Sequence, residues 1–145
     1  QVLGSRFINA AAAAGCPAQL MLISSGASLS PIQGWATYCA GKAAADMWAA
    51  TAGSEQASRN SKITIVSIAP GVVDTEMQGA IREAPDADFP SSERFHDLHS
   101  SGGLANADSV AATLLKIAEL NAGDSFGGTQ LENGARLDVR DFAAS

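Results

Sequence analysis

The chain alternates between segments with a helical pattern and short apolar runs typical of strands. Helices are predicted where apolar or Ala-rich residues recur on one face, over residues 2–14, 35–58, 74–83 and 108–120. Strands are predicted over 19–23, 62–68 and 127–131, with a possible extension over 135–139. The segments 24–34 and 84–103 are polar and contain Gly and Pro, which predicts a loop and a long mobile excursion.

Helices and strands therefore alternate along the chain. Alternation with apolar strands is typical of βαβ units, in which helices cover both faces of a parallel sheet. We predict an α/β fold with a doubly wound parallel sheet, where ligands bind at the carboxyl ends of the strands. The length of 145 residues, without an internal repeat or a linker, predicts a single domain over 1–145.

Composition narrows the choice of partners. Hydrophobic residues make up 46% of the chain and charged residues 17%, which is too apolar for a disordered protein. The net charge of −6 argues against nucleic acid or an anionic membrane as the partner. No apolar run reaches the length of a membrane span. A small-molecule substrate and a cytoplasmic location are expected, and Cys16 and Cys39 are predicted to be free core residues.

Three side chains near the predicted strand ends indicate acid catalysis on a carbonyl group. Tyr38 and Lys42 lie four residues apart at the start of the long helix, so they share a helix face. An ammonium close to a phenol favours the phenolate, and such a phenol can pass a proton to a carbonyl oxygen. Ser25 follows the first strand and is expected to hydrogen-bond that oxygen. Ser24 is the alternative, although strand alternation turns it away. By itself, the Tyr–Lys spacing also fits a packed aromatic ring and a solvated cation.

Longer motifs around these residues resemble a known family. Ser25 precedes Tyr38 by thirteen residues, and the second strand runs into Pro-Gly-Val-Val-Asp-Thr at residues 70–75. This arrangement resembles the short-chain dehydrogenase/reductase family, which has a Rossmann-type fold. The sepiapterin reductase branch, which bacterial benzil reductases resemble, is similar to the chain in three segments: QGWATYCAGKAAADM at 33–47, APGVVDTEMQ at 69–78 and NGARLDV at 133–139.

The resemblance implies that the protein reduces a carbonyl group, either of a ketone or diketone or of a pterin side chain. Tyr38 would donate the proton, Lys42 would bind the nicotinamide ribose and favour the phenolate, and Ser25 would orient the substrate carbonyl. An epimerase or dehydratase of the extended relatives shares the Tyr–Lys spacing but has a larger C-terminal substrate domain. This alternative is disfavoured because only 70 residues follow Thr75.

The resemblance also implies where the cofactor binds. The Val73 backbone and the Thr75 hydroxyl would hold the nicotinamide carboxamide, in a turn shaped by Pro70 and Gly71, while Tyr38 and Lys42 would contact the ribose. NADP(H) is implied by the branch. NAD stays open, because the sequence offers no residue that reads the ribose 2′ position.

Substrate contacts are expected from Ser25 and from three further residues, Trp35, Met77 and Asp138. In sepiapterin reductases an Asp near the C-terminus contacts the pterin, and Asp138 matches it; the alternative is a plain surface carboxylate. The excursion over 84–103 corresponds to the substrate lid. Its apolar residues would line the pocket or simply anchor the lid: Phe89, Phe95 and Leu98.

A feature of the family that binds the cofactor is absent from the sequence. There is no Gly-rich turn between a first strand and a first helix, the element that takes the pyrophosphate. The chain is therefore expected to represent the C-terminal half of the fold, without its N-terminal strands. Two hypotheses follow: a carbonyl reductase, or a half-domain that folds or dimerises without cofactor. The family implies a homodimer or homotetramer that assembles through the helices over 2–14 and 35–58.

A metal site is not expected. His96 and His99 are three residues apart and can share a helix face, but zinc requires a third and a fourth ligand. The two cysteines lie on other predicted elements. The glycines at 123, 127 and 128 follow a helix and precede a strand, the reverse of a phosphate-binding loop, and are predicted to form a turn.

Overall fold

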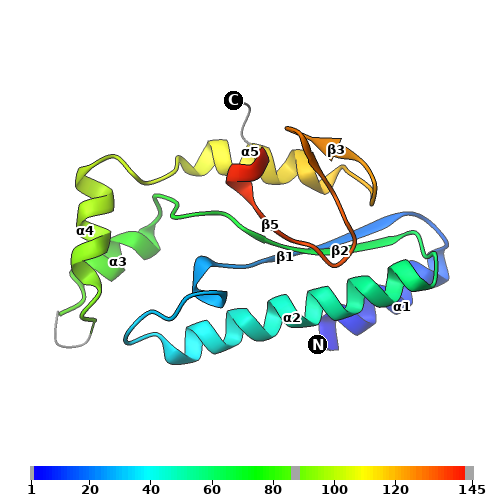
Figure 1. Ribbon diagram of the computed structural model, residues 1–145, viewed down its shortest axis with the longest axis horizontal. Helices are drawn as coiled ribbons and strands as arrows, with labels where there is room; N and C mark the ends of the chain where they lie inside the picture. The colour runs from blue at the N-terminus through cyan, green and yellow to red at the C-terminus, as the bar shows by residue number, and fades with distance from the viewer. Residues whose placement is uncertain (1, 86–88, 143–145) are drawn as a thin grey trace.

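A computed structural model describes residues 2–85 and 89–142 (Figure 1). The five helices in this part of the chain are α1 (Val2–Ala14), α2 (Ala36–Ser58), α3 (Glu76–Glu83), α4 (Ser92–Ser100) and α5 (Ala107–Ala118). The strands are β1 (Ala18–Ile23), β2 (Ile63–Ala69), β3 (Ser125–Phe126), β4 (Thr129–Gln130) and β5 (Arg136–Asp138). Short 3₁₀ helices cover Gly26–Ser28 (η1) and Val139–Phe142 (η2).

The main sheet has three parallel strands in the order β1-β2-β5. The central strand, β2, is buried along its whole length, which explains why its sequence is apolar on both faces. Ala69 at the end of β2 is opposite Asp138 at the end of β5, so the strands finish at one edge. The parallel α/β sheet that we predicted is confirmed.

The prediction of a third strand over 127–131 is wrong. Gly127 and Gly128 both have positive φ and form the turn of a small antiparallel hairpin between β3 and β4. Two consecutive residues with positive φ are typical of a tight hairpin turn, which reverses the chain. The third strand of the main sheet is instead β5, within the segment that was expected only as an extension.

Helices cover both faces of the sheet (Figure 1). On one face, α1 and α2 pack against alternate residues of β2, where Ile63 and Ile65 contact Ala49 and Ala52. On the other face, Val66 and Ile68 pack against Val110 and Ile117 of α5 and against Leu131 and Leu137. This alternation directs the side chain of Ser67 toward the α2 face. Neither cysteine is buried as predicted: Cys16 is exposed and Cys39 is half-buried.

The excursion over 84–103 contains a helix that the sequence analysis did not predict. Residues 86–88 lie outside the described part of the chain. Helix α4 lies beside α3, beyond the end of the sheet to which the strands point (Figure 1). Phe89 and Phe95 are almost fully buried in a separate apolar cluster with Ile81, and Trp35 packs against it. These aromatic residues fix the excursion to the body of the domain. In the described residues, no helix has both the length and the apolar character needed to cross a bilayer.

Candidate active site

The candidate residues gather where the parallel strands end. Ser24 and Ser25 follow β1, the turn from Pro70 follows β2, and Asp138 closes β5. Because the three strands are parallel and adjacent, their carboxyl ends form a single edge. Helix α2 begins beside this edge and carries Tyr38 and Lys42 on its first turns.

Tyr38 and Lys42 lie together, as their four-residue spacing requires. The Lys42 Nζ atom is 5.6 Å from the centre of the Tyr38 ring. The same ammonium group donates a hydrogen bond of 2.8 Å to the carbonyl oxygen of Ile23, the last residue of β1. This bond fixes the cation at the strand end. The Tyr38 ring meets the edge of Trp35, with 5.2 Å between the ring centres.

Ser24 and Ser25 have different surroundings, although they are neighbours. Ser24 is 3% exposed, and its hydroxyl donates to Oδ2 of Asp46 on α2 at 2.7 Å. Ser25 is half-buried, and its Oγ accepts a hydrogen bond of 3.2 Å from the Ala27 amide at the start of η1. An oxygen that accepts this bond still has its own proton to donate. Ser25 is therefore the serine whose hydroxyl is available to a carbonyl oxygen.

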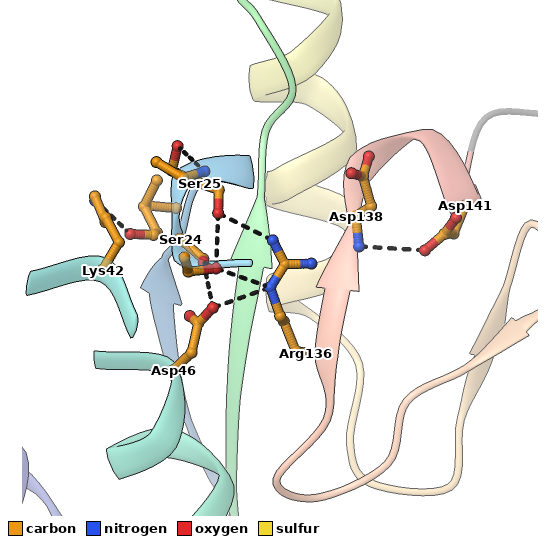
Figure 2. A network of polar contacts seen from close by, with 10 residues as sticks. Ser24, Ser25, Lys42, Asp46, Arg136, Asp138 and Asp141 are labelled. Carbon is orange, nitrogen blue, oxygen red and sulfur yellow. Dashed lines mark hydrogen bonds and ion pairs between the residues drawn. The ribbon is translucent and has the colours of Figure 1, made fainter. Parts of the chain in front are cut away.

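A partly buried polar network joins the two serines to Asp46 and Arg136 (Figure 2). Arg136, the first residue of β5, forms an ion pair of 2.9 Å with Asp46. Burial raises the pKa of Asp46, but the nearby hydroxyls of Ser28, Ser24 and Ser67 and the guanidinium of Arg136 outweigh this effect, so the net pKa is below its ordinary value. The Ser67 hydroxyl contributes from nearby, although its Oγ has no partner within hydrogen-bonding distance among the described residues.

The sequence analysis did not identify Asp46 or Arg136 as members of the site. Asp46 continues the spacing of Tyr38 and Lys42 by another four residues, so the helical pattern contained a signal for it. Arg136 had no such signal. It reaches the network because β5 pairs with β2 in the register that places Arg136 opposite Ser67.

The candidate substrate residues are not all brought together. Trp35 stacks on Phe89, with ring centres 4.9 Å apart, and this contact joins Tyr38 to the segment over 84–103. Met77 is 51% exposed on α3. Asp138 is held by the exposed guanidinium of Arg140, which hydrogen-bonds both carboxylate oxygens at 2.7 and 2.6 Å and lowers the pKa of Asp138. A substrate that binds Asp138 has to share it with Arg140.

The described part of the chain contains open cavities in two places. One cavity, of about 510 Å³, is lined by residues 31–34 together with Ala36 and Cys39. Another, of about 610 Å³, is lined by Pro90, Ser92, Glu93 and His96 on and before α4. Within residues 2–85 and 89–142, no three His, Cys, Asp or Glu side chains are grouped as metal ligands would be.

Comparison with known proteins identifies the family. The family model for short chain dehydrogenases matches residues 8–86, which is more than half of the chain. The chain belongs to the short chain dehydrogenase family. The matched region contains β1, α2 and β2, and thus Ser25, Tyr38 and Lys42.

Two similar relatives carry the names of reductases. It is 39% identical over 120 residues to the benzil reductase ((S)-benzoin forming) of Bacillus subtilis, a match that covers 83% of this chain and 46% of the relative. It is 36% identical over 120 residues to the sepiapterin reductase of Rattus norvegicus, with 83% of this chain and 41% of the relative covered. The chain therefore spans less than half the length of these two relatives.

A solved structure supports the same assignment. A short chain dehydrogenase/reductase from Saccharomyces cerevisiae superposes with a TM-score of 0.70 and 27% sequence identity. The match covers 88% of this chain and 47% of the yeast protein. The likeness confirms the Rossmann-type fold that the resemblance implied.

The family implies a nicotinamide cofactor, and the turn after β2 fits its carboxamide end. Val73 forms a parallel bridge with Ala105, in which Ala105 donates to the Val72 carbonyl at 2.8 Å and accepts from the Asp74 amide at 2.9 Å. In this pairing the amide and carbonyl of Val73 itself are directed to the opposite side. Thr75 precedes α3, but its hydroxyl forms no capping bond with that helix. Among the described residues these groups have no other hydrogen-bond partner, so both can bind an amide.

Gly71 shapes the same turn. Its φ is +80°, which favours glycine, and a Cβ built there meets no atom within 4 Å. The space above the turn is therefore open. The residues of the chain fit the nicotinamide end of the cofactor, and they include no Gly-rich turn for its pyrophosphate end.

Proposed function

We propose that the protein is an NADPH-dependent carbonyl reductase, in which Tyr38 is the proton donor. The observation that carries this proposal is the position of Lys42, whose ammonium lies 5.6 Å from the Tyr38 ring and is bonded to the end of β1. That arrangement puts a phenol and a cation at the strand ends where ligands of parallel sheets bind. Ser25, with its hydroxyl proton free to donate, follows the same strand.

Each residue of the site has a separate role in the proposed reaction. Ser25 donates a hydrogen bond to the substrate carbonyl oxygen and orients it toward Tyr38. Lys42 holds its positive charge beside the Tyr38 ring and binds the ribose hydroxyls of the cofactor. The backbone of Val73 and the hydroxyl of Thr75 hold the carboxamide. When bound, the reduced nicotinamide supplies a hydride to the carbonyl carbon, and the proton from Tyr38 completes the alcohol.

The names of the relatives suggest two substrate classes. One relative is a benzil reductase and the other a sepiapterin reductase. We propose a ketone next to a second carbonyl group or on a pterin side chain as the substrate. Trp35, Met77 and Asp138 would contact it, with the lid helix α4 closing the aromatic side. Benzil and sepiapterin are therefore the first substrates to test.

Replacement of Tyr38 by Phe tests the proposal. The change removes one hydroxyl and retains the ring that contacts Trp35, so the fold should be preserved. With benzil or sepiapterin and NADPH, we expect kcat to fall by about two to four orders of magnitude, because a positioned general acid contributes roughly that much. A kcat close to that of the wild type would refute the role of Tyr38.

Ser25→Ala tests the second residue, with Ser30→Ala as its matched control. Both serines lie in the loop after β1, and Ser30 is exposed. Ser25→Ala should lower kcat by about a hundredfold to a thousandfold, the usual range for the loss of one donor to the reacting oxygen. Ser30→Ala should leave it unchanged. Equal effects of the two substitutions would contradict a specific role for Ser25.

Cofactor binding separates this proposal from a chain that folds or associates without cofactor. Trp35 contacts Tyr38, so its fluorescence is expected to change when NADPH binds. Saturable quenching by NADPH, stronger than by NADH, is the expected result. No change with either nucleotide would favour the alternative.

Exposed apolar residues on α1 and α2 (Val2, Leu3 and Met47) support association into a homodimer or homotetramer.

A further inference from the structure

The carbonyl group of Ser25 is held from two sides. Ser28 Oγ donates to it at 2.8 Å, and Arg136 Nη2 donates to it at 3.0 Å. Ser28 is a local neighbour, whereas Arg136 is 111 residues further along the chain, on β5. The orientation of the peptide that follows Ser25 is therefore set in part by the third strand of the sheet.

Arg136 is itself fixed by Asp46. Its Nε donates to Asp46 Oδ2 at 2.9 Å and to Ser28 Oγ at 3.2 Å (Figure 2). The side chains of Arg136 and Asp46 are only 23% and 12% exposed, so water competes little for these bonds. Because the pKa of Asp46 lies below its ordinary value, the carboxylate is charged at neutral pH.

The network connects the two elements that carry the proposed catalytic groups. Asp46 is on the same face of α2 as Tyr38 and Lys42, one further turn along the helix. The Ser25 carbonyl belongs to the end of β1. The Arg136 guanidinium thus connects α2, which carries Tyr38, to the loop that contains Ser25. The Ser24 hydroxyl adds a hydrogen bond to Asp46 in the same network.

We propose that Arg136 is a positioning residue that aligns the Ser25 hydroxyl with Tyr38, by linking the Ser25 carbonyl to Asp46. The inference rests on the proposed function, in which Ser25 binds the substrate carbonyl. Arginine suits this task because its planar guanidinium holds two acceptors in a fixed geometry, whereas a lysine ammonium is a point charge on a flexible stem. An ion pair with a structural role alone would affect stability without acting through Ser25.

A double-mutant cycle of Arg136→Lys and Ser25→Ala tests this inference. Lysine retains the positive charge opposite Asp46 but lacks the planar guanidinium that bonds Asp46 and the Ser25 carbonyl at the same time. We expect Arg136→Lys to lower kcat roughly 10- to 100-fold, the effect of a small misplacement of a reacting group. The dissociation constant for NADPH should stay unchanged, because Lys42 and the turn after β2 are intact. In the Ser25→Ala background, the same change should lower kcat by less than about twofold, because the two residues act through one interaction.

Each other outcome has a distinct meaning. If Arg136→Lys lowers kcat by the same factor with and without Ser25, the residue does not act through Ser25 and the inference fails. An unchanged kcat in Arg136→Lys alone also overturns it. If instead Ser25→Ala by itself leaves kcat unchanged, the proposed role of Ser25 is wrong, and the inference fails with it for that separate reason.

Two further variants guard against a trivial loss of folding. Arg59→Lys is the matched control, since Arg59 is exposed at the end of α2, and it should leave kcat unchanged. Asp46→Asn retains the shape of the side chain but removes the charge that holds Arg136. It should lower kcat in the same direction as Arg136→Lys, by a smaller factor, and this loss should also disappear in the Ser25→Ala background. A loss that persists there would contradict the inference even if Arg136→Lys does not fold.

Discussion

Gly53 on α2 allows the turn at Asn133 and Gly134 to approach the helix. A Cβ built on Gly53 would lie 2.2 Å from the Gly134 nitrogen and 2.4 Å from its Cα, far inside contact distance. The turn matters because the Asn133 side chain bonds Ile65 N and Ile63 O, and thereby sets where β5 begins. A methyl group at position 53 must push backbone away, and backbone cannot yield as a flexible side chain does.

Gly53→Ala therefore combines two opposed effects. Alanine favours the helix by about 1 kcal/mol relative to glycine. Forcing a methyl group into a packed contact costs about 3 kcal/mol, at the upper end for overpacking because both close atoms are backbone. The net expectation is a loss of about 2 kcal/mol in the free energy of unfolding, which lowers Tm by roughly 4–8 °C.

Gly41→Ala provides the matched control on the same helix. A Cβ at Gly41 meets no atom within 4 Å, so only the gain in helix propensity remains. Its Tm should rise by roughly 2–4 °C. Thermal unfolding followed by circular dichroism at 222 nm measures both variants. If Gly53→Ala melts as high as Gly41→Ala, the turn does not pack on α2 as described.

Three other predictions concern acid stability, the lid and the helix ends. The pKa of Asp46 is lowered in the folded protein. Its contribution to the free energy of unfolding is therefore complete above its pKa in the unfolded chain, about 3.9, and is lost as the pH falls through its pKa in the folded protein. The free energy of unfolding of the wild type should therefore exceed that of Asp46→Asn by a constant amount above about pH 5, and urea titrations should show the difference narrowing below that. A difference that grows on acidification would contradict the assignment. Phe89→Ala should cost about 3 kcal/mol, because the ring is 4% exposed and stacks on Trp35, and the tryptophan emission should move to longer wavelength. Unchanged emission would mean that the ring does not cover the indole. Thr75→Ala should weaken NADPH binding without lowering Tm, since the Thr75 side chain does not cap α3. Asn106→Ala should instead lower the free energy of unfolding by about 1 kcal/mol, because the Asn106 side chain accepts a hydrogen bond from the Ser109 amide at the start of α5. Equal loss of Tm in both variants would argue against the free hydroxyl of Thr75.

Local spacing was sufficient for most of the elements and for part of the candidate site. The composition of residues 2–14 predicted α1, and the β-branched run before Pro70 predicted β2, because such patterns depend on near neighbours in the chain. The four-residue step from Tyr38 to Lys42 likewise predicted that the two side chains share a helix face. Their catalytic roles, and that of Ser25, stay predictions.

Long-range pairing decided the rest. The sequence pattern could not decide whether 127–131 or 135–139 forms the third strand, because a short apolar run does not identify the strand that it pairs with. The two adjacent glycines turn the first segment into a hairpin. The turn that packs on Gly53 places the second segment beside β2. That choice placed Arg136 opposite Ser67, against Asp46 and the Ser25 carbonyl. Helix α4 similarly depends on apolar contacts with Trp35, a residue more than 50 positions away. Contacts between distant segments are set by how whole elements pack, so only the folded chain reveals them.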